Sequence, residues 1–324
     1  MTTRTPSALL DRETTTQLRP RYEGSNIGSW IGFKHINYLA EEAVLDHFRA
    51  AGCSARSLYE DYGLCVEIVH LDTRISTGFR IDDLVNAVVR PEATSGGELA
   101  FVVSLTIGHG SGRRNATSKV RVLLRRDFLD APAEPAPAML LPFVVERIAR
   151  TESEPAPIPT LPGPYSTGHG AAGGDPVLDE LTRNSPSFAW RWRIPYPYCH
   201  FGRRLQLSGY LRLMEEVVDL FLADRGVSIR TLLGERSWIP VVPHSSITIL
   251  DEVIMEEELY TVFTVENVFR NVTFLARLDS YVLRDGALLR TASGRITHGY
   301  AEIVSRKDFH LTELDERVLA ALGG

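Results

Sequence analysis

The sequence repeats itself at a spacing of 174 residues, and this repeat constrains the fold more than any other feature. Tyr22–Gly28 aligns with Tyr196–Gly202 at that spacing. Further pairs follow it: Glu41-Glu42 with Glu215-Glu216, Gly52 with Gly226, His70 with His244, and Asp82-Asp83 with Glu256-Glu257. One such match carries little weight, but a constant spacing over about 60 residues indicates a duplicated structural unit.

Proline is concentrated between the two copies. Of the 18 prolines, 11 lie between Pro132 and Pro186. Proline removes backbone donors and interrupts regular structure, so most of this stretch is expected to be a linker, with one short helix in the apolar segment 139–149. The predicted organisation is listed in chain order: a first unit over residues 15–130, the linker over 131–186, a second unit over 187–310 and a C-terminal helix over 311–324.

Each copy has the pattern of one helix followed by extended strands. The expected helices cover Gly32–Ala51 and Ser208–Asp224, and the second carries apolar residues on nearly all sides. The runs that follow are rich in β-branched and aromatic residues, as in Leu99–Ile107 and Tyr260–Val265. The predicted fold class is therefore α+β, with an antiparallel sheet that curls around a buried helix in each copy.

Composition and charge exclude several function classes. The net charge of −6 does not suit a nucleic-acid-binding protein, which needs a basic surface for phosphate contacts. No apolar run approaches the roughly 18 residues of a membrane span, and the polar residues Met1–Pro6 lack the apolar core of a signal peptide. Cys53, Cys65 and Cys199 form neither a disulfide framework nor a metal-binding spacing. We expect a cytoplasmic protein without metal, nucleic-acid partner or membrane segment.

Two motifs in the second copy are similar to those of hotdog-fold acyl-CoA thioesterases. That superfamily carries Tyr-x-Asp-Thr-Asp-x-x-Gly followed by Tyr-Leu-Arg-Phe-Met-Glu, and here Tyr196–His200 and Tyr210–Glu215 occupy this frame. The resemblance implies a tandem, or double, hotdog fold that acts on acyl thioesters. The position of the family's catalytic aspartate holds His200 here and Asn26 in the first copy, so neither copy keeps the acid.

The first copy resembles a smaller family. Trp30–Ala43 and Ser57–Gly63 look like the bifunctional acyltransferase/decarboxylase of leinamycin-type polyketide pathways, a double hotdog that spans essentially the whole chain. The resemblance implies that methylmalonyl-CoA loses carbon dioxide and that a propionyl group passes to an acyl carrier protein. Coenzyme A and phosphopantetheine would be substrate carriers, with no other cofactor. The catalytic tyrosine of that family corresponds to Tyr62.

The implied decarboxylation generates an enolate, and helix N-terminal N–H groups can stabilise its negative charge. We expect Asn26, Gly28 and Gly32, at the entry to the first helix, to bind the substrate, and His35 to donate to the enolate or the carboxylate. The alternative is that the glycines only turn the chain and that His35 is structural.

The role of Tyr62 has two interpretations. It is either an acyl acceptor, which requires a nearby cation or donor that lowers the pKa of the phenol, or the proton donor that quenches the enolate. His200 is the third candidate catalytic residue, which either faces Tyr62 or lines a second site.

Two other functions remain open from the sequence alone. One is a hotdog thioesterase or dehydratase acting on carrier-bound polyketide chains, with the glutamate pairs 41–42 and 215–216 as its acids. The other is a carrier-binding module without turnover. A monomer and a homodimer are both compatible with a double hotdog.

Overall fold

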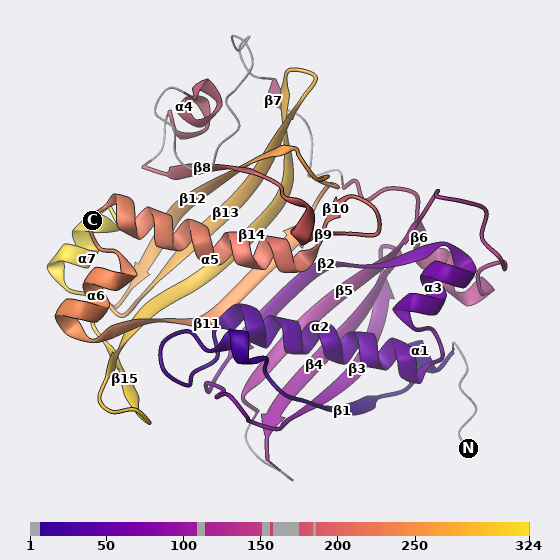
Figure 1. The fold of residues 1–324 in the computed structure, drawn as a ribbon, viewed down its shortest axis with the longest axis horizontal. Helices are drawn as coiled ribbons and strands as arrows, with labels where there is room; N and C mark the ends of the chain where they lie inside the picture. The colour runs from indigo at the N-terminus through magenta and orange to yellow at the C-terminus, as the bar shows by residue number, and fades with distance from the viewer. Residues whose placement is uncertain (1–6, 109–113, 151–155, 158–174, 184–185, 324) are drawn as a thin grey trace. The chain divides into compact units, whose positions relative to one another are not determined.

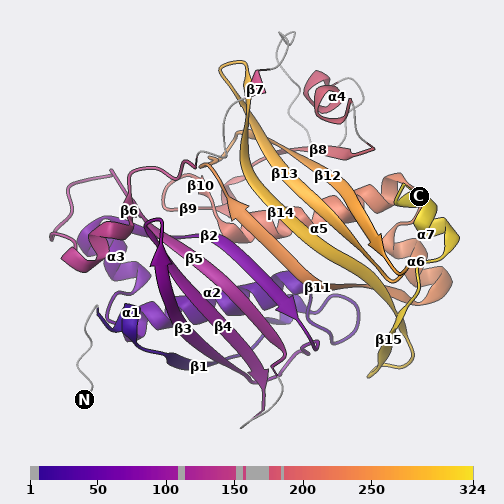
Figure 2. The same ribbon diagram turned by 180° about the vertical axis from the view of Figure 1, so that it is seen from behind.

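The computed structural model describes residues 7–108, 114–150, 156–157, 175–183 and 186–323 (Figure 1). The chain divides into two compact units, Met1–Ile148 and Ala149–Gly324. The boundary between the units thus falls inside the expected linker, 131–186. Each unit has one long helix lying against an antiparallel sheet, which Figure 2 shows from the opposite side.

Unit 1 contains the sheet order β1-β3-β4-β5-β2. The strands are β1 (Thr14–Leu18), β2 (Leu64–Ile75), β3 (Val85–Ser95), β4 (Glu98–Ile107) and β5 (Ala116–Arg126), with β6 (Val144–Val145) parallel to β5. The helices are α1 (Ala8–Asp11), α2 (Phe33–Ala50) and α3 (Ala55–Tyr62), with 3-10 turns η1 (Tyr22–Gly24) and η2 (Ala138–Phe143). The long helix α2 packs across β1 to β5.

Unit 2 repeats this arrangement with the sheet order β11-β14-β13-β12-β8. Its strands are β8 (Phe188–Arg193), β11 (Trp238–Ile249), β12 (Glu258–Phe269), β13 (Thr273–Arg284) and β14 (Ala287–Ile303), with β7 (Ala156–Pro157) and β15 (Phe309–Thr312) on β14 and the pair β9 (Cys199–His200) and β10 (Arg204–Leu205). The helices are α4 (Pro176–Thr182), α5 (Leu207–Asp224), α6 (Ile229–Arg236) and α7 (Glu316–Ala321), with the 3-10 turn η4 (Tyr196–Tyr198).

The structural units follow the sequence repeat closely. The starts of α2 and α5 differ by 207 − 33 = 174, those of α3 and α6 by 229 − 55 = 174, and those of β2 and β11 by 238 − 64 = 174. Unusual backbone conformations also recur: φ is +70° at Asp82 and +71° at Glu256. The duplicated unit predicted from the repeat is therefore confirmed.

The long helices differ in how much of their surface is buried. Helix α2 buries one apolar face, whose members are at most 5 % exposed: Ile36, Leu39, Ala40, Ala43, Val44 and Phe48. Helix α5 is more amphipathic than expected. Its side facing away from the core carries Glu216, Asp219 and Asp224, which are exposed. The expectation of a helix wrapped on all sides is therefore wrong for α5.

Two smaller helix predictions need revision. The apolar segment 139–149 forms the 3-10 turn η2 followed by the short strand β6 rather than an α-helix, and Pro142 lies inside that turn. At the C-terminus, β15 covers 309–312 and α7 is confined to 316–321, where the side chain of Asp315 caps its start.

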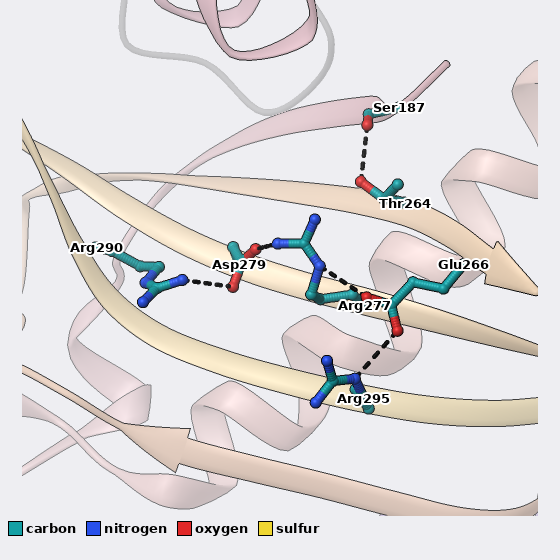
Figure 3. Close-up of polar contacts among 7 residues, drawn as sticks. All are labelled: Ser187, Thr264, Glu266, Arg277, Asp279, Arg290 and Arg295. Atoms are coloured by element: carbon teal, nitrogen blue, oxygen red, sulfur yellow. Dashed lines mark hydrogen bonds and ion pairs between the residues drawn. The ribbon is translucent and has the colours of Figure 1, made fainter. Parts of the chain in front are cut away.

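One face of the unit 2 sheet carries a network of charged side chains (Figure 3). Its members are Arg277, Arg290, Arg295, Glu266 and Asp279. Glu266 accepts hydrogen bonds from Arg277 at 3.0 Å and from Arg295 at 3.1 Å, and Asp279 pairs with Arg277 and Arg290. Beside it, the hydroxyls of Ser187 and Thr264 lie 2.7 Å apart. Each acid is shared between two arginines, so this network joins β12, β13 and β14.

Candidate active site

The loop before α2 is folded back onto the first turn of that helix. The N–H of Gly32 donates to the carbonyl of Gly24 at 3.0 Å, and the N–H of Asn26 donates to the carbonyl of Trp30 at 3.3 Å. Gly32 is the N-cap of α2 and has no side chain with which to cap it. The loop and the start of the helix therefore form one compact structure around the amide groups of the first turn.

Asn26 lies directly over the N-cap of α2. A β-carbon built on Gly32 would be 2.5 Å from Nδ2 of Asn26 and 3.1 Å from its Oδ1. Contacts below 3 Å are not tolerated, so glycine is required at position 32 for the amide of Asn26 to occupy this place. Asn26 is itself exposed. An accessible amide donor thus stands beside the positive end of the α2 dipole.

His35 occupies the first turn of the same helix and is 2 % exposed. Its ring makes an edge contact with Tyr38, with centroids 4.9 Å apart. On its other side lies the backbone of Gly24, where a β-carbon would be 2.8 Å from Cγ of the imidazole. Two glycines, Gly24 and Gly32, therefore make room for the two polar side chains at this helix end.

Gly28 has a different role from Gly32. Its φ of +73° lies in the left-handed region, and its counterpart Gly202 has φ of +88°. A β-carbon on Gly28 would meet only the Trp30 ring, at 3.8 Å. The structure thus supports the chain-turning interpretation of Gly28, and a contact with substrate at this residue stays a prediction.

The helix end offers backbone donors as well as side chains. Helix geometry leaves the first four N–H groups without intrahelical acceptors. In α2 the N–H groups of His35 and Ile36 turn back to the carbonyl of Gly32, at 3.1 and 3.3 Å, and the N–H groups of Phe33 and Lys34 precede them in the first turn. An oxygen anion placed here would meet backbone dipoles and the Asn26 amide together.

Unit 2 fills the corresponding space differently. The repeat aligns Gly24 with Tyr198 and His35 with Gly209. A β-carbon on Gly209 would lie 2.5 Å from Cδ1 of Leu205 and 3.2 Å from Cβ of Tyr198. The large and small residues have thus exchanged places, and the start of α5 is packed by Tyr198 and Leu205 where unit 1 has a histidine.

His200 takes the position of Asn26 in unit 2. It lies in β9, is half-buried, and its ring packs 4.8 Å from that of Phe201. Its backbone pairs with Arg204 of β10. It therefore stands in the loop that leads into α5, as the motif alignment predicts, and its catalytic role stays a prediction.

Tyr62 is the last residue of α3, and Gly63 follows in the left-handed conformation. Burial raises the pKa of the Tyr62 phenol, and the carboxylates of Glu134 and Asp61 raise it further. These surroundings are the opposite of what a tyrosine nucleophile needs. The phenol is protonated at neutral pH, as an unperturbed tyrosine is.

Unit 1 does not bring Tyr62 together with His35 and Asn26. Helix α2 has 18 residues, a length of about 27 Å, and His35 lies in its first turn. Helix α3 follows the last turn of α2, whereas Asn26 precedes its first turn, and Figure 1 shows α3 beside the C-terminal end of α2. Within this unit, the predicted catalytic residues occupy two separate places.

The glutamate pairs expected as acids of a thioesterase lie near the middle of the long helices. Glu42 pairs with Arg49 at 3.5 Å and Glu41 is half-buried. In unit 2, Glu215 is half-buried and Glu216 is exposed.

Other kinds of site can be assessed for the described ranges. In that part of the chain there is no group of three or more histidine, cysteine, aspartate or glutamate side chains arranged to bind a metal ion. No helix among the described residues has the length and apolar character that crossing a bilayer requires.

Comparison with known proteins identifies the fold. No family model matches the chain, and no curated protein matches its sequence. Solved structures do match. A protein described as an oleoyl thioesterase, from Lactobacillus plantarum, aligns with a TM-score of 0.59 and 13 % identity over 89 % of this chain and 95 % of its own.

Two further structures agree with this match. The 12:0-ACP thioesterase of Umbellularia californica gives a TM-score of 0.57 at 9 % identity, covering 89 % of this chain and 97 % of that one. An acyl-ACP thioesterase of Bacteroides thetaiotaomicron gives 0.53 at 10 %, covering 88 % and 97 %. The predicted fold is therefore confirmed: the chain is an α+β protein with the double hotdog fold.

Proposed function

We propose that this protein is an enzyme acting on acyl thioesters at the N-terminal end of α2, and that its reaction is decarboxylation of methylmalonyl-CoA with transfer of the propionyl group to an acyl carrier protein. The fold supports the class of substrate, because its full-length structural neighbours act on acyl thioesters. The reaction itself is supported by the resemblance of unit 1 and by the chemistry of one residue.

That residue is Asn26. An amide donates hydrogen bonds to an oxygen anion but does not act as a general base at neutral pH. Hydrolysis needs a base or nucleophile for the attack on the thioester, whereas decarboxylation needs only stabilisation of the developing negative charge. An amide held over the start of α2 by Gly32 meets the second requirement.

The proposed reaction proceeds in three steps. The bond between the α-carbon and the carboxylate breaks, its electron pair forms the enolate, and carbon dioxide leaves. The negative charge on the thioester oxygen is stabilised by the Asn26 amide and the first N–H groups of α2. After protonation at the α-carbon, the carrier thiolate attacks the propionyl carbonyl and the coenzyme A thiolate leaves.

Tyr62 is proposed as the proton donor on the resemblance of Ser57–Gly63, not on the geometry of unit 1. The raised pKa of its phenol argues against the acyl-acceptor alternative, which needs a lowered pKa. His35 is proposed to orient the carboxylate or the enolate, since it stands in the same helix turn as the donors. His200 is proposed as a catalytic residue in the corresponding loop of unit 2, which leads into α5.

Thioester hydrolysis is the second candidate function, and the comparisons favour it over the first. The three neighbours cited above are all described as thioesterases. In that case the substrate would be a CoA-linked or carrier-linked acyl chain, and the products would be a free acid and a thiol.

Product analysis with two substrates separates these reactions. Methylmalonyl-CoA should yield carbon dioxide and a propionyl thioester, and propionyl-CoA incubated without carrier protein should stay intact. Release of free methylmalonic acid, or of propionic acid from propionyl-CoA, would instead identify a thioesterase. Gly32→Ala is the variant to compare with the wild-type enzyme in this assay, because its methyl group displaces the Asn26 amide without changing any titratable group.

A further inference from the structure

A chain of buried polar side chains lies beneath the first turns of α2. Thr73 donates a hydrogen bond to Oδ1 of Asn37 at 2.5 Å, and the hydroxyls of Thr73 and Ser118 lie 2.8 Å apart. Nδ2 of Asn37 donates to the carbonyl of Phe33 at 3.1 Å. Asn37 is 1 % exposed, and Thr73 and Ser118 are both 0 % exposed.

The direction of this hydrogen-bond chain is fixed by its two ends. The Phe33 carbonyl only accepts, so the Asn37 amide nitrogen must face it and the Asn37 oxygen must face Thr73. Thr73 gives its single proton to that oxygen, so Ser118 donates to Thr73. Every donor therefore points the same way, from β5 through β2 and α2 to the first peptide group of the helix.

Unit 2 lacks this chain. The residues at the corresponding positions are Leu211, Ile247 and Gly294, at offsets of 174, 174 and 176. The strand register confirms the correspondence, since Thr73 pairs with Ser118 and Ile247 pairs with Gly294. An apolar set thus supports the same helix–sheet contact in the same fold, so packing alone does not require the polar residues.

We infer that Asn37, Thr73 and Ser118 are positioning residues of the unit 1 site, where their hydrogen-bond chain polarises the first peptide group of α2 and strengthens its amide as a donor to a substrate oxygen anion. A hydrogen bond to the carbonyl of Phe33 shifts charge within the peptide group that continues to the N–H of Lys34. That N–H belongs to the helix end that Asn26 overlies. This inference rests on the proposed function for its catalytic consequence.

The decisive variant is Thr73→Val, which removes the hydroxyl and keeps the shape of the side chain. We expect kcat for decarboxylation of methylmalonyl-CoA to fall about tenfold with KM unchanged, because the stronger donor acts on charge that develops during reaction. Thr73→Ser restores the hydroxyl and should restore most of kcat. Wild-type kcat in Thr73→Val, or an equal loss in Thr73→Ser, would overturn the inference.

A matched control comes from unit 2. Thr261 and Ser280, on β12 and β13, form a buried hydroxyl pair 3.0 Å apart that has no part in the unit 1 hydrogen-bond chain. Thr261→Val therefore loses the same kind of hydrogen bond and should keep wild-type kcat. A loss as large as that of Thr73→Val would show that both variants act through stability alone.

A triple variant, Asn37→Leu with Thr73→Ile and Ser118→Gly, copies the set that unit 2 uses. It replaces the three polar side chains together, and we expect it to fold and to show the same loss of kcat. Normal kcat in the folded triple variant would contradict the inference.

A readout that needs no turnover separates this inference from the proposed function. The ¹⁵N chemical shift of the Lys34 amide follows hydrogen bonding at the Phe33 carbonyl in the same peptide group. It should move upfield in Thr73→Val and stay in place in Thr261→Val. An unchanged shift contradicts the inference, whereas a wild-type protein that turns over no thioester contradicts only the proposed function.

Discussion

The backbone of Gly24 lies against the imidazole of His35 so closely that a β-carbon at position 24 would be 2.8 Å from Cγ of the ring. The repeat allows this contact to be compared with unit 2, which has Tyr198 and Gly209 at the same two positions. One unit keeps the space beside its helix end for a histidine, and the other fills it with a tyrosine. The relationship points to unit 1 as the unit whose helix end is arranged for chemistry.

Gly24→Ala tests the importance of that contact. The added methyl group must displace the His35 ring, and a displacement near 1 Å can cost about 100-fold in rate. We expect a loss of kcat of that order for methylmalonyl-CoA. The control is Gly234→Ala in α6, where a β-carbon would meet nothing within 4 Å. Equal activities in the two variants would remove His35 from the mechanism.

Asn26→Asp tests the chemistry of the amide. The new carboxylate is held ionised by the helix dipole, donates no hydrogen bond, and repels both the substrate carboxylate and the enolate. We expect decarboxylation to fall about 100-fold, as for loss of one oxyanion donor. Carbon dioxide release and free coenzyme A are measured separately. A variant that decarboxylates at the wild-type rate would refute the role of Asn26.

Tyr62→Phe tests the phenol with little change in volume. Because the surroundings of Tyr62 raise the pKa of its phenol, whereas a nucleophile needs it lowered, we expect no acyl ester on the peptide 55–62 after rapid quenching of the wild-type enzyme. As a proton donor it should contribute at least about tenfold to turnover. A tyrosyl ester found by peptide mass spectrometry would restore the acyl-acceptor interpretation, and full turnover in the variant would exclude both roles.

We predict that the buried side chain of His298 makes the folded state of unit 2 less stable in acid. Burial lowers the pKa of this histidine from its ordinary value near 6.5 to about 4. The unfolded chain therefore binds a proton that the folded chain excludes, so stability is complete above pH 6.5 and falls as the pH drops toward 4. The loss at pH 4 is about 3 kcal/mol from this group.

Urea unfolding at pH 7 and at pH 4 measures this effect. His298→Phe should flatten the difference by about that amount, while His310→Gln, on the exposed surface of β15, should leave it in place. An unchanged pH dependence in His298→Phe would contradict the assignment.

Much of the fold could be predicted from the sequence because the two units diverged while keeping their spacing. The expected helices, 32–51 and 208–224, agree with α2 and α5 to within one residue at each end, and both are followed by strands as expected. The failures were local. Asp219 and Glu216 give α5 an exposed side, and Pro142 turns the expected short helix into a 3-10 turn.

Only part of the candidate site could be predicted from the sequence. Asn26, Gly32 and His35 were selected by their place before and within the first helix turn, and the structure places them at one helix end. Gly24 and the Asn37–Thr73–Ser118 chain were missed, because their importance lies in contacts between segments far apart in sequence. A comparison of the two repeats would have found them, because the repeats differ at these positions. Gly24 aligns with Tyr198, and the polar chain aligns with Leu211, Ile247 and Gly294.

The most direct test of the proposed reaction is the intact mass of an acyl carrier protein after incubation with the wild-type enzyme and methylmalonyl-CoA. Transfer with decarboxylation predicts a carrier bearing a propionyl group on its phosphopantetheine. A carrier that gains no acyl group, while methylmalonic acid and free coenzyme A accumulate, would contradict the account and identify hydrolysis as the reaction.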